Sequence, residues 1–379
     1  MNIGFDGKRA ANNLTGLGNY SRSLITQLAK RFHQNQYFVY SQKIKDKPQI
    51  TSFFKEDRIH LKLAPSASLN FLWRSFGIKK QLKKDKIDLF HGLSYEIPVG
   101  LKAAKIKSVV TIHDLIYLRY PDHYKRTDRY IYDFKSKYAC KKSDRIVAIS
   151  ERTKQDIVDF YKISEDKIEV IYQTCDDSFK QLQTQEIKGT VRRKYNLPEK
   201  YILNVGTVEA RKNLLALIIA LKDIDPAYNL VVVGKKQSYA GRVQEKIDVL
   251  KLNDRVIFLE GLPFSDLPSV YQMASAFVYP SFYEGFGIPI LEALYSEVPV
   301  IAATGSCLEE AGGPGSIYVH PEDTAALALQ VNRVLRDEQV QKKMIANGIE
   351  YVRKFDDQLL ANQMMDCYLK TLNNNFVSC

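Results

Sequence analysis

Residues 276–292 read Ala-Phe-Val-Tyr-Pro-Ser-Phe-Tyr-Glu-Gly-Phe-Gly-Ile-Pro-Ile-Leu-Glu, and the changes of pattern within them decide the fold. The apolar run Ala276–Tyr279 predicts a buried strand, and the glycines after it predict a turn. Pro289 suits the first turn of a helix, where its missing N–H costs no hydrogen bond. A strand, a glycine turn and a helix N-terminus in succession form an anion site, because unpaired N–H groups and the positive dipole end point the same way.

Two glutamates and three backbone amides carry the chemistry of this stretch. Glu284 is expected in the loop at the mouth of the anion site. Glu292 is expected about one turn into the helix, where its carboxylate can accept two neighbouring hydroxyls, as on a ribose. The backbone at Phe286, Gly287 and Ile288 is expected to face the bound group. The alternative to an anion site is a purely structural one, a tight strand-to-helix turn with a capping glutamate. This alternative accounts for the glycines taken alone, but it accounts less well for the two carboxylates.

Strand and helix patterns alternate along the whole chain, which predicts an α/β fold with parallel sheets covered by helices. The first series of β-rich runs lies near residues 3–5, 37–40, 59–63, 89–91, 109–112, 146–149 and 168–171. The second series lies near residues 201–205, 230–233, 256–259, 276–279, 300–302 and 316–319. Two such series predict two Rossmann-like domains, with ligands at the carboxyl ends of strands and in the cleft between the domains.

The expected domain boundaries follow from these two series. The N-terminal domain is expected to span residues 1–178 and the second domain residues 179–355, with a last helical segment over residues 356–379. The polar stretch 176–198 shows little periodicity and is interpreted as the linker.

Composition narrows the class of protein. The chain has 379 residues, 45% hydrophobic and 26% charged, as expected of a globular protein of two or three domains. No apolar stretch is long enough to span a bilayer, and the N-terminus lacks a secretion signal. The five cysteines are scattered and never paired as Cys-x-x-Cys, which favours free thiols and a cytoplasmic location over a zinc site or a disulfide framework.

The net charge of +12 is concentrated in the N-terminal half. Residues 1–180 contain 34 lysines and arginines against 20 aspartates and glutamates. This surplus fits a binder of anions such as phosphorylated lipid, an anionic membrane or nucleic acid, and it also fits a merely solvated basic surface. The segment 69–86 combines lysines with large apolar residues, so it is either a basic helix lying on a membrane or a helix packed on its own sheet.

A second cationic motif opens the C-terminal series. The strand at residues 201–205 ends in Gly206, and Arg211 and Lys212 follow just before a helix. Arg211 could hold a diphosphate with two N–H groups while Lys212 adds a point charge. Two cations at a helix start are electrostatically unfavourable unless an anion binds, although a solvated pair explains the motif taken alone.

The N-terminal series contains two weaker signals. Gly16 and Gly18 form a glycine loop before a helix, but without a third glycine and a closing acidic residue they argue against nicotinamide binding. His113 ends a strand, where a cleft residue belongs, and His91 is a weaker candidate of the same kind. The pair Asp223 and Asp225 resembles a metal-binding Asp-x-Asp but lies in a loop before a proline, so no metal site is expected.

The motifs around Arg211 and Glu284 resemble those of the retaining GT-B glycosyltransferases of family 4, whose Glu-x7-Glu signature matches Glu284 and Glu292. The resemblance covers essentially the whole chain and implies two Rossmann-like domains facing across a cleft, with the final helix crossing back onto the first domain. Many members have an arginine directly after the glycine, whereas this chain has Thr207. That departure leaves Arg211 and Lys212 to hold the leaving group and matches the mannosyltransferase-like branch better.

The resemblance implies a function and a role for each residue. A hexose, first of all mannose from GDP-mannose, would pass to a glycan or lipid-linked saccharide in surface polysaccharide synthesis without a metal or other cofactor. Glu292 would hold the ribose and Glu284 the sugar hydroxyls, Arg211 and Lys212 the diphosphate, and His113 would orient the sugar. The loop with Gly16 and Gly18 would lie beside the donor phosphate and the acceptor.

The alternatives within this fold are transfer from UDP-glucose or from UDP-N-acetylglucosamine, and the alternative outside it is a non-catalytic basic binding protein. The expected partners of the enzyme are the donor, the acceptor and, through the basic N-terminal half, the inner face of an anionic membrane. No nucleic acid is expected.

Overall fold

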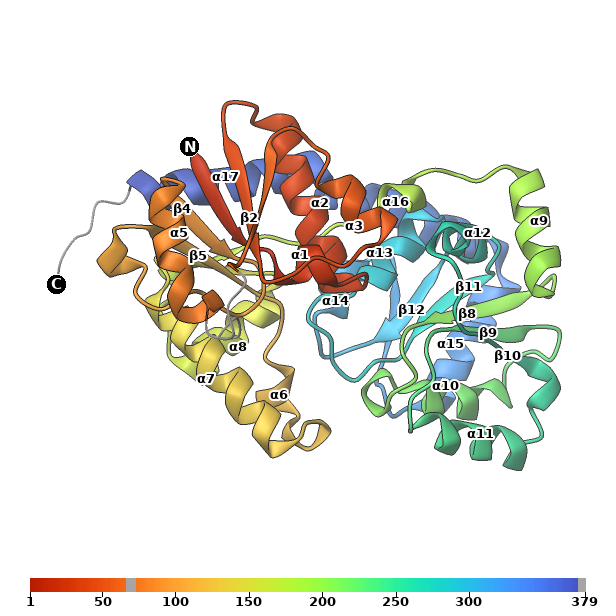
Figure 1. Ribbon diagram of the computed structural model, residues 1–379. Helices are drawn as coiled ribbons and strands as arrows, with labels where there is room; N and C mark the ends of the chain where they lie inside the picture. Colours follow the sequence, from red (N-terminus) through yellow and green to blue (C-terminus); the bar gives the residue numbers. More distant parts are fainter. Residues whose placement is uncertain (66–72, 374–379) are drawn as a thin grey trace. The chain divides into compact units, whose positions relative to one another are not determined.

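The computed structural model describes residues 1–65 and 73–373, and the chain divides into two compact units (Figure 1). Unit 1 consists of Met1–Gln173 and the C-terminal segment that begins at Phe355. Unit 2 consists of Thr174–Lys354.

Unit 1 is built on a parallel sheet that has seven strands in the described part of the chain, in the order β3-β2-β1-β4-β5-β6-β7. The strands are β1 (Asn2–Asp6), β2 (Gln36–Ser41), β3 (Ile59–Leu63), β4 (Leu89–Gly92), β5 (Lys107–Ile112), β6 (Arg145–Ala148) and β7 (Ile168–Val170). The α-helices are α1 (Lys8–Asn12), α2 (Gly16–Arg31), α3 (Pro48–Phe53), α5 (Ile78–Lys84), α6 (Ile116–Arg119), α7 (Arg126–Lys142), α8 (Glu151–Tyr161) and α17 (Asp357–Asn373).

Unit 2 repeats this plan with a parallel sheet of six described strands in the order β10-β9-β8-β11-β12-β13. The strands are β8 (Tyr201–Val205), β9 (Asn229–Val233), β10 (Val256–Leu259), β11 (Ala276–Tyr279), β12 (Val300–Ala303) and β13 (Ile317–Val319). The α-helices are α9 (Gln185–Tyr195), α10 (Leu214–Leu221), α11 (Ala240–Val249), α12 (Leu267–Gln272), α13 (Ile288–Tyr295), α14 (Leu308–Gly312), α15 (Thr324–Arg336) and α16 (Glu338–Val352).

Both sheets are buried on their faces by helices, which explains why their strands are almost continuously apolar. In unit 1, α2 and α17 cover one face, where Ile3, Phe5 and Val109 are buried. The helices α5, α7 and α8 cover the other face, where Phe90 and Val110 are buried. In unit 2, one face packs against α10, α11 and α15. The predicted α/β fold with parallel sheets is therefore confirmed.

The C-terminal helix α17 belongs to the core of unit 1. Its buried side chains include Met364 and Tyr368, and the hydroxyl of Tyr368 lies 2.6 Å from Nδ1 of His91. The other ring nitrogen of His91 lies 2.8 Å from the hydroxyl of Thr111. His91 is fully buried and burial lowers its pKa to about 3, so it is a neutral core residue that joins β4, β5 and α17.

The linker interpretation of residues 176–198 was wrong, because this stretch contains α9 and a short 3-10 turn, Asp177–Lys180. The hydroxyl of Thr184 accepts a hydrogen bond from the amide of Ile187, and Asn196 ends the helix in a left-handed conformation. Only Val191 of this helix is buried. The helix carries a narrow apolar stripe of Ile187, Val191 and Tyr195 at helical spacing, which the polar composition of the stretch obscures in the sequence.

The basic segment 69–86 is described from Trp73 onward, and residues 69–72 lie outside the described residues. Ile78 and Leu82 of α5 are fully buried in the core of unit 1. The apolar side of α5 is therefore used within the fold, whereas Lys80, Lys83 and Lys84 are exposed. No helix in the described ranges is long and apolar enough to cross a membrane.

Candidate functional site

The order of strands brings two distant loops of unit 2 together. In the sheet, β8 and β11 are neighbours, and the strand order reverses between them. The loops that follow β8 and β11 therefore leave the same edge of the sheet side by side, at the position where open α/β sheets bind ligands. The first loop carries Arg211 and Lys212, and the second carries Glu284. The amide of Phe282 donates to the carbonyl of Arg211 at 3.0 Å and joins the loops directly.

Glu284 is the centre of a hydrogen-bonded ion cluster. Its Oε2 lies 2.8 Å from a terminal nitrogen of Arg211, and its Oε1 lies 2.6 Å from Nζ of Lys212. The hydroxyls of Ser281 and Tyr279 donate to Oε1 at 2.6 and 3.1 Å. The carboxylate thus fixes both cations that the sequence singled out.

Arg211 has a second set of acceptors. It donates to a carboxylate oxygen of Glu209 at 2.7 Å and to the carbonyl of Tyr283. Two cations and two carboxylates therefore balance within the cluster. A guanidinium carries five N–H groups, so Arg211 retains donors beyond these contacts.

Charge pairing sets the protonation of the cluster. Burial alone would raise the pKa of Glu284, but Lys212 and Arg211 outweigh burial and lower the pKa to about 2. Burial alone would lower the pKa of Arg211, but Glu284 and Glu209 outweigh it and raise the pKa. Both groups are therefore charged throughout the neutral pH range.

Two glycines beside this cluster have positive φ angles. Gly206 has a φ of 152°, and the side chain of Lys212 lies 3.6 Å from the position that a β-carbon on Gly206 would take. Gly287, at the end of the second loop, has a φ of 121° that other residues rarely adopt. A β-carbon on Gly287 would lie 3.1 Å from Leu308.

The helix α13 starts directly after Gly287, with Ile288 as its first residue and Pro289 as its second. Its first turn has no acidic residue, and no side chain in the described part of the chain caps this N-terminus. The Sγ atom of Cys307 lies 2.9 and 3.2 Å from the carbonyl oxygens of Glu284 and Phe286 in the preceding loop, and its thiol can donate to either of them. The helix N-terminus predicted from the sequence is therefore present next to the second loop.

Glu292 lies further along α13 and does not join the ion cluster through any contact among the described residues. Its Oε2 accepts a hydrogen bond from the hydroxyl of Tyr271 at 2.8 Å. Burial raises the pKa of Glu292 to about 7, with the hydrogen bond from Tyr271 opposing and the charge of Asp176 assisting the shift. Glu292 is therefore a buried carboxyl group that is partly protonated at neutral pH, and hydroxyl donors from a ligand would stabilise its charged form.

The glycine loop of unit 1 is held by a buried arginine that the sequence analysis missed. Arg22 of α2 donates to the carbonyls of Ala10 and Asn13 at 2.9 and 2.7 Å. Gly18 lies against Asn13, whose carbonyl oxygen would be only 1.9 Å from an added β-carbon, whereas Gly16 has open space around it. Gly18 is needed for close packing, and Gly16 leaves the start of α2 accessible.

His113 is placed at the end of β5, as expected, and packs against α2 of the same unit. Its ring lies 4.9 Å from that of Tyr20 in an edge-to-face arrangement. Its Nε2 lies 2.9 Å from the carbonyl of Leu93, and its Nδ1 lies 2.9 Å from the side-chain nitrogen of Gln173. Because a carbonyl only accepts, Nε2 carries the proton and Nδ1 accepts. Burial lowers the pKa of His113 to about 4, so the ring is neutral at physiological pH.

The structure thus brings Arg211, Lys212 and Glu284 into direct contact and places Glu292 on the adjacent helix. Gly16, Gly18 and His113 belong to the other unit. Among the residues that the structure describes, no group of three or more His, Cys, Asp or Glu side chains could hold a metal ion. The sequence analysis did not identify four residues that contact the two glutamates or the loop between them: Tyr271, Tyr279, Ser281 and Cys307. Residues of these types are common in cores, and only their contacts in the structure distinguish them.

Comparison with known proteins adds family information to this geometry. Residues 188–351 match the profile described as "Glycosyl transferases group 1", and residues 14–179 match the profile described as "Glycosyltransferase Family 4". O-antigen chain mannosyltransferase B of Escherichia coli is 26% identical over 94% of this chain and 96% of its own length. O-antigen chain mannosyltransferase RfbU of Salmonella typhimurium is 32% identical over 56% of this chain and 57% of its own length.

A solved structure extends the comparison to the fold. Anabaena HepE, solved in complex with UDP-glucose, superposes with a TM-score of 0.78 over 98% of this chain and all of its own chain, at 18% identity. This likeness concerns the fold alone, which is the GT-B arrangement. From the two profiles, which together span most of the sequence, the chain belongs to glycosyltransferase family 4 (glycosyl transferases group 1), a family of retaining hexosyltransferases.

Proposed function

We propose that the protein transfers a hexose, with mannose as the first candidate, from a nucleoside diphosphate sugar to a glycan or lipid-linked saccharide in surface polysaccharide synthesis. The proposal is supported by the two O-antigen mannosyltransferases to which the chain is similar. The observation that carries it is the meeting of Arg211, Lys212 and Glu284 at the switch point of unit 2, beside the uncapped N-terminus of α13.

In the proposed mechanism the donor diphosphate lies against α13 and the two cations. Negative charge grows on the diphosphate as the bond to the sugar breaks, and fixed positive charge stabilises that state most. Arg211 and Lys212, held by Glu284, would supply this charge together with the amides at Phe286, Gly287 and Ile288. We propose that these groups take the place of a divalent ion.

The carboxylates of Glu292 and Glu284 have separate roles in this mechanism. Glu292 would accept the ribose hydroxyls, whose hydrogen bonds favour its charged form over the protonated form. Glu284 would accept hydroxyls of the transferred sugar while it holds the cations in place. His113 is assigned to the surroundings of the sugar, where a hydroxyl could reach Nδ1 by displacing Gln173.

The second candidate is transfer of glucose or N-acetylglucosamine from a UDP sugar, and the UDP-glucose complex of the similarly folded HepE favours testing it. Purified protein should be incubated with GDP-mannose, UDP-glucose and UDP-N-acetylglucosamine, and release of the nucleoside diphosphate should be followed. Stabilisation by GDP and UDP in thermal unfolding would report the base independently, since a ligand bound only by the folded state raises the midpoint. Turnover of a UDP sugar and not of GDP-mannose would overturn the mannose assignment.

We further propose a cytoplasmic location with reversible contact to the inner face of an anionic membrane. This part is supported by the charge surplus of residues 1–180 and the exposed lysines of α5.

A further inference from the structure

Tyr279 contacts both partners of the central ion pair in unit 2. It is the last residue of β11 and only 1% exposed. Nζ of Lys212 donates to the hydroxyl oxygen of Tyr279 at 2.5 Å, and this hydroxyl donates to Oε1 of Glu284 at 3.1 Å. The phenol therefore accepts from the cation and donates to the carboxylate at the same time.

Only the protonated form of this phenol can make both contacts. Burial and the charge of Glu284 raise the pKa of Tyr279 well above its ordinary value of 10, so the hydroxyl keeps its proton at physiological pH. Nζ of Lys212 also lies 5.0 Å from the centroid of the Tyr279 ring, which is within the range of a cation–π contact. Both the hydroxyl and the ring of Tyr279 thus attract the ammonium.

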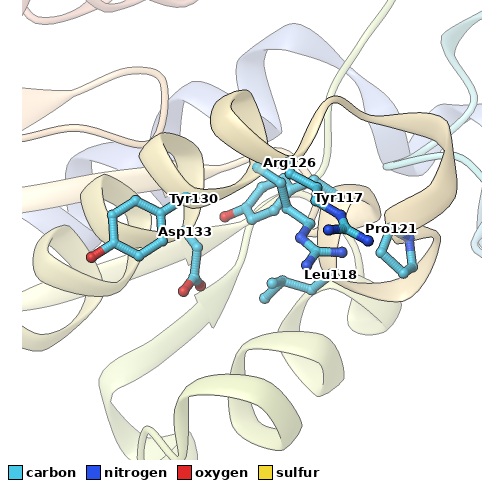
Figure 2. Close-up of a pocket in the computed structure, with 7 residues that line it drawn as sticks. Tyr117, Leu118, Pro121, Arg126, Tyr130 and Asp133 are labelled. Carbon is cyan, nitrogen blue, oxygen red and sulfur yellow. The ribbon is translucent and has the colours of Figure 1, made fainter.

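Burial makes these contacts stronger than those of charged groups near the surface. The pocket that α6 and α7 line in unit 1 contains charged groups of the second kind, among them Arg126 and Asp133 (Figure 2). Arg126 is exposed, so water competes for its hydrogen bonds and salt screens its charge. The side chains of Lys212 and Glu284 are only 17% and 11% exposed, so each hydrogen bond that they make with Tyr279 contributes more.

The number of donors on Lys212 shows what the hydroxyl of Tyr279 adds. A lysine ammonium has three N–H donors on a flexible stem, so a single acceptor does not fix its orientation. Glu284 accepts one of these donors, with Oε1 2.6 Å from Nζ, and the Tyr279 hydroxyl accepts a second. Two acceptors on different residues leave the third N–H group with one direction, because the N–H bonds are tetrahedral.

We propose that Tyr279 is a positioning residue, whose hydroxyl holds the ammonium of Lys212 so that its third N–H group is aimed at the donor diphosphate. The role toward the diphosphate rests on the proposed function, whereas the hold on Lys212 does not. Donors that are fixed before the reaction stabilise developing negative charge without reorganisation. A mobile ammonium would still attract the diphosphate of the bound donor, so loss of the hydroxyl slows the chemical step more than it weakens donor binding.

The hold on Lys212 is tested without turnover, in full-length wild type and Tyr279→Phe treated with a trace of acetic anhydride. The rate of acetylation at Lys212 is measured by mass spectrometry relative to Lys343, which is exposed on α16 of the same unit. Phenylalanine keeps the ring and removes only the hydroxyl. Acetylation of Lys212 should be about tenfold faster in the variant, because a hydrogen bond to a charged group is lost and the amine is less protected.

Ser281→Ala is the matched control. The hydroxyl of Ser281 donates to the same Oε1 of Glu284 at 2.6 Å, and among the described residues no contact joins Ser281 to Lys212. This variant removes a hydroxyl from the same carboxylate oxygen and leaves the hold of Tyr279 on Lys212 in place. It should therefore not accelerate the acetylation of Lys212.

The effect on catalysis is tested with the donor that gives turnover. Tyr279→Phe should lower kcat by about tenfold and change the KM for the donor by no more than about threefold. In a Lys212→Ala background the same substitution should lower kcat further by at most about twofold, because the hydroxyl acts through Lys212. Ser281→Ala, which acts on Glu284, should lower kcat by the same factor in both backgrounds.

Two results would overturn the inference, provided that thermal unfolding shows each variant to be folded. One is equal acetylation of Lys212 in wild type and Tyr279→Phe. The other is an equal loss of kcat from Tyr279→Phe in both backgrounds, which would assign the hydroxyl to Glu284 or to the fold instead of to Lys212.

Failure of this inference can be distinguished from failure of the proposed function. Absence of turnover with every donor, or near-normal turnover of Lys212→Ala, would overturn the proposed function, while acetylation still decides whether Tyr279 holds Lys212. Turnover that depends on Lys212, together with an unchanged kcat in Tyr279→Phe, would overturn only the inference.

Discussion

Glu284 Oε1 lies 2.6 Å from Lys212 Nζ, although the two residues are in different loops of unit 2 and far apart in the sequence. The ion pair spans the point where β8 and β11 separate, and it holds the ammonium in one position. It also keeps the cluster near neutrality before any ligand binds, because Glu209 pairs with Arg211 on the other side.

Replacing Arg211 or Lys212 by alanine should lower turnover by roughly two to three orders of magnitude, the effect of losing one charge-stabilising donor. Turnover should be measured under saturating donor, with circular dichroism to verify folding. Lys236→Ala is the matched control, because Lys236 pairs with Glu260 on the exposed surface of the same unit. Near-normal turnover of either site variant would show that the diphosphate is bound elsewhere.

Activity should survive a chelator such as EDTA, since fixed cations are proposed to act where a divalent ion otherwise would. The assay should use protein dialysed against the chelator and then supplied with Mn²⁺ or Mg²⁺. Loss of activity with the chelator and its recovery with either ion would contradict the proposed role of Arg211 and Lys212. It would direct attention to carboxylates such as Asp223 and Asp225.

Glu284 should contribute to stability above pH 4.5 and lose this contribution as the pH falls toward 2. Its pKa is about 2 in the folded protein against an ordinary value of 4.5, so the unfolded chain binds the proton more tightly in this range. The shift corresponds to a contribution of the order of 3 kcal/mol near neutral pH.

Urea unfolding of wild type and Glu284→Gln at pH 3 to 7 tests this prediction. The gap between their free energies of unfolding should narrow as the pH falls. Glu260→Gln is the control, because an exposed ion pair contributes at most about 1 kcal/mol. A gap that is independent of pH would mean that Glu284 is not held as a charged group by its partners.

Nucleoside diphosphate binding should release protons near pH 6.5 if Glu292 accepts the ribose hydroxyls. The pKa of Glu292 is about 7 without ligand, and hydroxyl donors lower it, so affinity should rise between pH 5.5 and 7.5. Calorimetry with GDP and UDP in two buffers of different ionisation enthalpy measures the protons released. Glu292→Gln should remove the part of the release that comes from the carboxyl group and leave the part that comes from the terminal phosphate, whose own pKa is about 6. A wild type that releases no more protons than this variant would remove Glu292 from the ribose site.

Charge reversal on α5 should weaken binding to anionic vesicles. Lys80, Lys83 and Lys84 are exposed, and each lysine near an anionic membrane contributes on the order of 1 kcal/mol. Their joint replacement by glutamate should release the protein from phosphatidylglycerol vesicles at low salt and leave nucleotide affinity intact. If the wild-type protein does not bind such vesicles even at low salt, the lysines of α5 form a solvated surface and not a membrane contact.

The sequence alone was sufficient for the strands and for the α/β class. Buried parallel strands are short apolar runs bounded by turn residues, so runs such as those that became β8 and β11 are recognisable without a partner. Gly287 and Pro289 likewise predicted the start of α13, because backbone conformation at a helix start is a local property. The helix α9 was missed because its apolar stripe is narrow and the residues around it are polar or charged.

Only the tertiary structure decided which candidate groups meet and in which protonation state. Glu284 pairs with Arg211 and Lys212 because the sheet order makes β8 and β11 neighbours, and a sequence does not contain that order explicitly. The two glutamates of one motif differ in pKa, at about 2 for Glu284 and about 7 for Glu292. Glu292 is buried and only 11% of the Glu284 side chain is exposed. Glu284 has two cations within hydrogen-bond distance whereas Glu292 has the neutral hydroxyl of Tyr271, and this difference in surroundings arises from the fold.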